Sequence, residues 1–265
     1  MPTTYAHDLF GKRVYRRLPG KLKRLIRGNS NLYRIGLHGP DILFYYFISP
    51  NPVTRFGVNM HGQKAANFFE TGMEQVRRDK DPALMAYLIG FGCHYILDST
   101  CHPYVNQAAG MEHISHTMLE KEFDRMLMLE TGKNPMQFYP SDCIVPRYTY
   151  AKTIHKVMPQ VRTKNIFASL KMMKIFTNLL VCNDGGRKRR RIEKILSVFG
   201  RGPQAFVSDF FMTPEPEVSC REELFMLDTL MEEALDKAPD MLAELAALAV
   251  HPGHLSESWN HTYNG

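Results

Sequence analysis

Cysteine is scarce in this sequence, and its spacing does not suggest pairing. The five cysteines are Cys93, Cys101, Cys143, Cys182 and Cys220, an odd number without a Cys-x-x-Cys pair. A disulfide framework is therefore not expected, and reduced thiols are typical of the cytoplasm. The first residues lack the apolar stretch of a signal peptide, and no segment reaches the ~18 apolar residues of a membrane span. We therefore expect a cytoplasmic protein without a transmembrane helix.

Several catalytic motifs are also missing. The chain has no Gly-x-Ser-x-Gly, no His-Glu-x-x-His and no glycine-rich P-loop. These absences argue against nucleophile-elbow hydrolases, the common zinc proteases and P-loop nucleotidases. Period-2 alternation of β-branched residues is nearly absent, so no sheet is expected. What the chain does have is 265 residues, of which 44% are hydrophobic, enough to bury a sizeable core.

Apolar residues recur at helical spacing along most of the chain. One segment, which begins with Asp81 as N-cap and Pro82 at the first helical position, is apolar nearly all round and should be central and buried. It is expected to end at His102-Pro103, because a proline disfavours helix continuation. The pattern predicts helices over 61–79, 81–101, 111–130, 148–158, 163–181, 188–199 and 219–249. The predicted fold is an all-α multi-helix bundle.

Positive charge is concentrated in two segments. The chain has 33 Lys and Arg against 27 Asp and Glu. Residues 11–34 contain nine basic residues and no acidic one, and residues 187–191 read Arg-Lys-Arg-Arg-Arg. Such runs favour anionic partners such as a phospholipid headgroup, a membrane surface or nucleic acid. A solvated basic helix face is the alternative interpretation.

The central helix carries three metal-ligand side chains at intervals of four. His94, Asp98 and His102 drift only about 40° per step, so they project from one stripe. Two ligands at i and i+4 can share one metal, the third can reach a neighbouring one, and a carboxylate between two imidazoles can bridge. A core histidine or a local hydrogen bond is the alternative, but an ionised carboxylate buried without a cation would be very costly.

The 111–130 segment repeats this spacing with His116 and Glu120, and zinc favours such mixed nitrogen and oxygen ligands. Asp41 follows a Gly-Pro turn and is either a helix cap or a metal ligand. His61 is expected to open a helix, and His7 lies in the first helical turn of the chain. Neither histidine is diagnostic by itself.

The order of these residues resembles the zinc-dependent phospholipase C family of bacteria, which is more distantly related to fungal zinc nucleases that act on single strands. The positions that carry the resemblance are His7, Asp41, His61, His94, Asp98, His102, His116 and Glu120. The resemblance covers about residues 1–130, and beyond them only helical character continues. It implies an all-helical fold with up to three zinc ions in a cleft between helices.

The resemblance also implies a role for each position. One zinc would take Asp41, His61, His94 and Asp98, a second would take His102, His116 and Glu120, and a third would take His7 with Asp98 as a bridge. Asp41 would also be the general base. In secreted members of the family, the processed N-terminal residue completes the third site. Here the amine of Pro2, exposed by removal of Met1, is the expected substitute.

The sequence thus predicts a single domain over 1–265, with a metal-binding part in about 1–130 and supporting helices in about 148–250. His251, His254, Trp259 and His261 are interpreted as a surface tail. The predicted activity is zinc-dependent hydrolysis of phosphodiesters, with release of a phosphorylated headgroup from a phospholipid. The alternatives are a nuclease or other soluble phosphodiesterase, and a non-catalytic binding protein stabilised by metal. Contact with an anionic membrane is favoured over nucleic acid, and the sequence does not set the oligomeric state.

Overall fold

The computed structural model describes residues 4–47, 51–111, 114–198 and 207–265, and within these ranges it contains helices and no strand. The predicted all-α fold is confirmed. The helices are α1 (Thr4–Arg17), α2 (Gly20–Gly28), α3 (Ser30–Gly36), η1 (Gly39–Tyr45), α4 (Pro52–His61), α5 (Ala65–Asp79), α6 (Pro82–Gly110), α7 (His116–Glu130), η2 (Pro140–Cys143), α8 (Tyr148–His155), α9 (Thr163–Leu180), α10 (Arg187–Ser197), α12 (Arg221–Ala247) and η3 (Glu257–Trp259). No helix in this part of the chain combines the length and apolar character needed to cross a bilayer. All five cysteines are buried and free.

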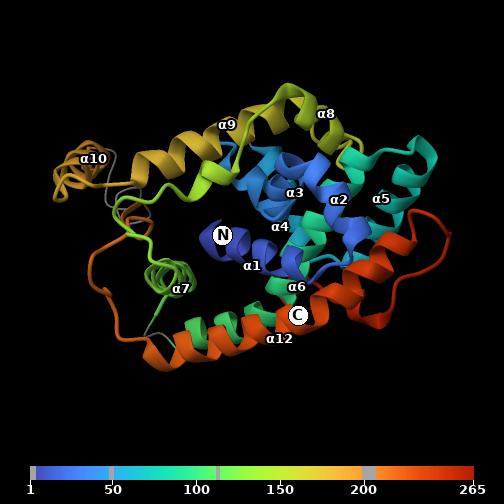
Figure 1. Cartoon of the computed structure of the whole chain (residues 1–265). Helices are drawn as coiled ribbons and strands as arrows, with labels where there is room; N and C mark the ends of the chain where they lie inside the picture. Colours follow the sequence, from blue (N-terminus) through green and yellow to red (C-terminus); the bar gives the residue numbers. More distant parts are fainter. Residues whose placement is uncertain (1–3, 48–50, 112–113, 199–206) are drawn as a thin grey trace.

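Helix α6 is the central element of the bundle and contacts α1, α3, α5, α7, α8 and α12 (Figure 1). It begins as predicted, because the Asp81 carboxylate accepts the backbone N–H groups of Ala83 and Leu84 at 2.9 and 3.0 Å. Its side chains are almost all buried from Leu84 to Asp98. An apolar helix of this kind is stable only when other helices cover every side of it, as they do here.

The predicted end of this helix was wrong. Helix α6 continues through Pro103 to Gly110. A proline inside a helix removes one backbone donor and destabilises the helix, but packing on the helix surface can outweigh that loss. Cys101, His102, Val105 and Ala108 are all buried around the proline. The extra two turns bring His102 into the interior of the bundle.

The predicted position of His61 was also wrong. His61 does not open a helix but is the last residue of α4, and Gly62 separates α4 from α5. Helix α4 begins after Asn51, whose side chain accepts the Thr54 N–H at 2.9 Å. Helix α7 likewise starts later than predicted, at His116, where the Ser115 hydroxyl accepts the Met118 N–H at 3.1 Å. The cap at Ser115 thus sets the start of α7, whereas α5 begins at Ala65 without a side-chain cap.

Residues 251–265 do not form a surface tail. His251, His254 and His261 are exposed, but Trp259 and Tyr263 are fully buried. Trp259 stacks on Tyr95 of α6 with ring centroids 5.3 Å apart. The segment therefore folds back from α12 onto the central helix.

Two glycines allow α3 and α6 to touch through their backbones. A Cβ on Gly90 would lie 2.1 Å from the Tyr33 carbonyl oxygen, and one on Gly36 would lie 2.2 Å from the Tyr87 carbonyl oxygen. Because both neighbours are backbone atoms, they cannot move aside without shifting a helix.

Replacement of Gly90 by alanine is therefore expected to lower the free energy of unfolding by about 3 kcal/mol, measured by denaturant titration. The control is Gly28→Ala in α2, where no atom lies within 4 Å of the added Cβ. That change should raise stability by about 0.5–1 kcal/mol through helix propensity. Equal stability of the two variants would contradict the close packing of α3 on α6.

Candidate metal centre

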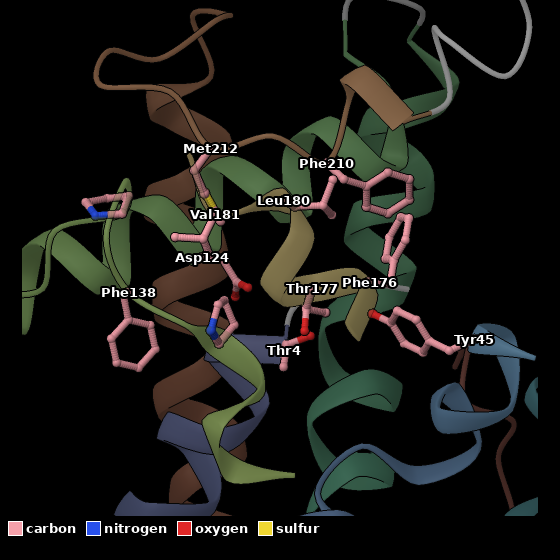
Figure 2. A pocket seen from close by; sticks show the side chains of 12 residues that line it. Thr4, Tyr45, Asp124, Phe138, Phe176, Thr177, Leu180, Val181, Phe210 and Met212 are labelled. Carbon is pink, nitrogen blue, oxygen red and sulfur yellow. The ribbon is translucent and has the colours of Figure 1, made fainter. Parts of the chain in front are cut away.

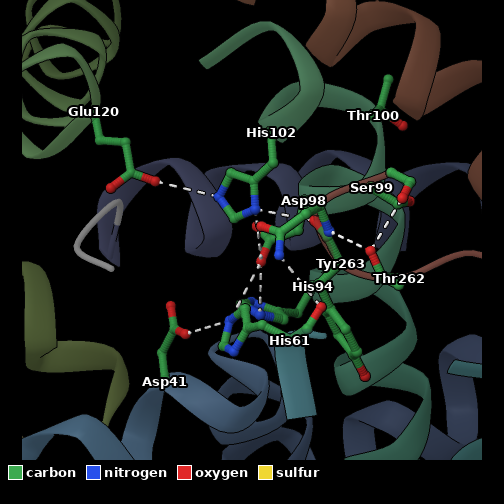
Figure 3. Close-up of polar contacts among 12 residues, drawn as sticks. Asp41, His61, His94, Asp98, Ser99, Thr100, His102, Glu120, Thr262 and Tyr263 are labelled. Atoms are coloured by element: carbon green, nitrogen blue, oxygen red, sulfur yellow. Dashed lines mark hydrogen bonds and ion pairs between the residues drawn. The ribbon is translucent and has the colours of Figure 1, made fainter. Parts of the chain in front are cut away.

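Eight candidate ligands come from five helices and meet around α6. They are His7 on α1, Asp41 on η1, His61 on α4, His94, Asp98 and His102 on α6, and His116 and Glu120 on α7. Their ligand atoms form three groups, each within 4.8 Å: His7, Asp41 and His94; His61, His94 and Asp98; and His102, His116 and Glu120. The structure thus brings together all eight positions that the sequence singled out, and Figure 3 shows most of them.

The Asp98 carboxylate lies between imidazoles from different helices. Its Oδ1 is 3.3 Å from His7 Nε2, and its Oδ2 is 3.0 Å from His94 Nε2. His61 Nε2 lies 3.9 Å from the same Oδ2 and 3.0 Å from Asp41 Oδ1. A carboxylate whose two oxygens face different imidazoles can bridge two metal ions, which is the role expected for Asp98.

A second group sits one helical turn further along α6. His102 Nε2 is 3.4 Å from Glu120 Oε1, and His116 Nε2 is 3.2 Å from the same oxygen. His102 Nδ1 is also 3.8 Å from Asp98 Oδ2, so the two groups are neighbours. His102 and Glu120 are buried, whereas the His116 side chain is 33% exposed. The accessible side of the centre is therefore the His116 side.

Three imidazoles are oriented by hydrogen bonds that their Nδ1 atoms make to oxygens outside the ligand set. His61 Nδ1 bonds to the Gly57 carbonyl at 2.9 Å, His102 Nδ1 to the Tyr263 carbonyl at 3.0 Å, and His116 Nδ1 to Asn106 Oδ1 at 3.1 Å. A proton held on Nδ1 leaves the Nε2 lone pair free. This outward bond is the usual support of metal-binding histidines.

The buried carboxylates are held ionised. Burial raises the pKa of Asp98, but the positive charge of His102 and a hydrogen bond from His7 outweigh burial and hold that pKa well below its ordinary value. Burial likewise raises the pKa of Asp41, and a hydrogen bond from His61 overcomes it, so that the net direction is strongly downward. Anionic oxygens at neutral pH are what a divalent cation requires.

The two imidazoles on α6 differ. Burial lowers the pKa of His94, which keeps this side chain neutral at pH 7. Burial also lowers the pKa of His102, but the charges of Asp98 and Glu120 raise it to about 9. His102 therefore carries a positive charge that compensates the carboxylates when no metal does so.

Several buried polar atoms in this centre make no well-aligned hydrogen bond within the described residues, although three of them take part in the ion-pair contacts given above. They are His7 Nδ1, Asp41 Oδ1, both ring nitrogens of His94, and Asp98 Oδ2. Native interiors rarely leave such atoms unsatisfied, and each one costs about 1–3 kcal/mol. Three of these five atoms, Asp41 Oδ1, His94 Nε2 and Asp98 Oδ2, lie in the contacts between candidate ligands described above. The donor set of imidazole nitrogens and carboxylate oxygens therefore fits zinc, and a zinc ion bound here would supply the missing partner.

Two neighbours of the centre were not anticipated. Asp124 continues the ligand stripe of α7 but caps α1 instead, because its oxygens accept the N–H groups of Tyr5 and Ala6 at 3.0 and 2.8 Å. Gly39 has φ +44°, and a Cβ there would lie 2.2 Å from the His94 ring. The Gly-Pro turn is the sequence signal for Gly39, and the spacing of four from Glu120 is the signal for Asp124, which suggested a place on the ligand stripe and not a cap of α1.

The expected role of Pro2 in a third site falls on residues outside the described ranges. Within the described residues, His7 reaches Asp98 and the group of Asp41 and His94. Its place in the structure thus fits the bridged site that the sequence resemblance implied.

An all-helical chain that gathers imidazoles and carboxylates around one buried aspartate defines a class of metal-centre protein. The chain belongs to the zinc-dependent phospholipase C family, because the model of that family matches residues 6–168. This match contains all eight candidate ligands and extends into α9, beyond the first 130 residues on which the sequence resemblance rested. Neither a search of curated proteins nor a search of solved structures found a significant match.

Replacing Gly39 by alanine should displace His94 and reduce bound zinc well below the wild-type amount, measured by elemental analysis after reconstitution. The control is Gly132→Ala, which has a similar positive φ of 71° but no atom within 4 Å of the added Cβ. Both variants pay about 1–2 kcal/mol for the left-handed backbone. Full zinc content in Gly39→Ala would show that this contact does not position His94.

Proposed function

We propose that this protein is a zinc-dependent phosphodiester hydrolase that cleaves phospholipids in the manner of a phospholipase C. The observation that carries the proposal is the convergence of eight ligand side chains with unsatisfied buried atoms, in a chain of this family. The groups suit two to three zinc ions. His102, His116 and Glu120 would hold one, and Asp41, His61, His94 and Asp98 another, with His7 beside Asp98 for a third.

Zinc in such a site neutralises the charge of a phosphodiester and acidifies water towards a pKa of ~7. The chain's own residues have the remaining tasks. Asp41 is the proposed general base, because it is ionised, close to His61 and less enclosed than Asp98. Because the pKa of Asp41 is low, its carboxylate is a weak base. It could accept a proton only from a water molecule whose own pKa a bound zinc had lowered. His116, at the accessible edge, is placed to meet the phosphate first.

An apolar pocket beside the centre supports a lipid substrate (Figure 2). Thr4, Tyr45 and Asp124 line it, and each lies three or four residues from a candidate ligand on the same helix. The other lining residues are mostly apolar and include Phe138, Phe176, Leu180, Val181, Phe210 and Met212. An acyl chain suits such an apolar lining, whereas a nucleotide would find few hydrogen-bond partners there.

Because α9 supplies part of the pocket lining and α12 packs on α6, we treat residues 1–265 as one domain.

Asparagine at position 41 should separate chemistry from metal binding, because its amide oxygen can still act as a ligand while it cannot take a proton. We expect hydrolysis of p-nitrophenyl phosphocholine to fall about 100- to 10,000-fold with zinc content retained. The control is Asp142→Asn, a surface carboxylate whose side chain is 68% exposed.

Assays with a phospholipid and with single-stranded nucleic acid decide between the alternative functions. Release of phosphorylated headgroup from phospholipid, without digestion of single-stranded nucleic acid, supports the proposal. The reverse preference would make the protein a nuclease. A zinc-loaded protein that hydrolyses neither substrate would be a metal-stabilised binding protein.

Part of the basic segment remains available for an anionic membrane, the partner that we propose. Lys12, Arg13 and Arg17 pair with acidic residues on α1 and α12 at 2.6, 3.0 and 2.8 Å. By contrast, three basic residues of α2 are exposed and have no ion pair within the described part of the chain: Lys21, Arg24 and Arg27. An apolar groove lined by Leu25, Val76 and Met85 borders Lys21. A cationic surface beside an apolar groove fits a membrane that contains anionic lipid.

The cytoplasmic location of the protein stays a prediction.

Reversal of these three charges to glutamate should weaken binding to phosphatidylserine vesicles at least about 100-fold, since each basic residue contributes ~1 kcal/mol at such a surface. Hydrolysis of a soluble substrate should not change. The matched control reverses Arg187, Arg190 and Arg191 on α10. Sedimentation with vesicles measures both variants, and an equal loss in both would argue against a specific role for α2.

A further inference from the structure

Residues 256–265 are anchored firmly on the central helix. The Trp259 indole N–H donates to Glu244 of α12 at 3.1 Å, and the Tyr95 hydroxyl of α6 donates to the Ser258 carbonyl at 2.9 Å. Trp259 and Tyr263 are buried to 0% and 1% exposure. The path of this segment is therefore set by α6 and α12 together.

The segment reaches both groups of candidate ligands through Tyr263. Its backbone N–H donates to the His61 carbonyl at 3.2 Å, and its carbonyl accepts from His102 Nδ1 at 3.0 Å. Its ring lies 5.4 Å from the His61 ring and 5.9 Å from the His94 ring. One residue thus touches three candidate ligands (Figure 3).

The hydrogen bond that orients His102 is long-range in the sequence, whereas the one that orients His61 is local. His61 Nδ1 bonds to Gly57, four residues earlier on its own helix, so this bond forms whenever α4 forms. The partner of His102 lies 161 residues away. The tautomer of His102 therefore depends on the docking of a distant segment. Because the Tyr263 carbonyl holds the Nδ1 proton, Nε2, which faces Glu120, is the nitrogen left to give up its proton and bind a metal.

We infer that Tyr263 is a positioning residue of the metal centre, whose backbone carbonyl fixes His102 in the tautomer that presents Nε2 to zinc. The inference rests on the proposed function, because it concerns the same centre. Loss of such an outer hydrogen bond typically reduces metal affinity about 10- to 100-fold.

Two truncations test the inference. Ending the chain after Thr262 removes the Tyr263 carbonyl, and ending it after Asn264 keeps it. We expect the shorter chain to bind zinc about 10- to 100-fold more weakly in competition with a chelator. The chain ending at Asn264 should match the full-length protein. The new carboxylate at Thr262 adds a negative charge, which favours zinc, so it cannot cause the loss.

A spectroscopic signature complements the affinities. In the zinc-loaded full-length protein, ¹⁵N NMR should show His102 with a proton on Nδ1 and zinc on Nε2. A structural role for the segment alone would not fix this tautomer. If the chain ending at Thr262 fails to fold, this spectrum decides the question.

The outcomes are distinguishable. Equal zinc affinity of the two truncated chains, or zinc on Nδ1 of His102, would overturn the inference and leave the proposed function standing. A full-length protein that binds no zinc after reconstitution would overturn both.

Discussion

The structure depends on a single buried carboxylate. Asp98 is 4% exposed and lies in the middle of an apolar helix, where an unpaired charge would be very costly. Four imidazoles from α1, α4 and α6 surround it within 3.9 Å. The bundle can bury Asp98 only because these helices converge there. Their convergence in turn creates a cluster of side chains that could hold metal ions.

The length of α6 follows from this arrangement. His94, Asp98 and His102 must share one stripe if a single aspartate is to lie between two groups of ligands. The helix therefore continues through Pro103, and the packing of Val105 and Ala108 supports the turns beyond it. If the helix ended at residue 101, His102 could leave the stripe and its Nε2 would no longer face Glu120.

Local features of the centre could be predicted from the sequence, and long-range features could not. The His94/Asp98 and His116/Glu120 pairs follow from helical periodicity alone, so their juxtaposition was foreseen. The place of His61 at the end of α4 was missed, because the apolar pattern of 61–79 runs past the break at Gly62. The contact of Tyr263 with His102 spans 161 residues, and no spacing rule connects two positions so far apart. The burial of Trp259 escapes prediction for the same reason, since its mostly polar neighbours in the sequence resemble a solvated tail.

The balance of charges in the ligand set explains why such a centre suits an anionic substrate. The set contains three carboxylates, and its other five members are imidazoles, which bind metal in the neutral form. Two divalent ions already exceed the three carboxylates in charge, so a loaded centre is cationic towards a phosphodiester. A site with more carboxylates would repel that substrate, and one with fewer would hold the ions only weakly.

The centre is exposed at one edge, because the His116 side chain is partly exposed while Asp98 is buried. For that reason, the field of a metal-loaded centre would be strongest towards solvent at His116.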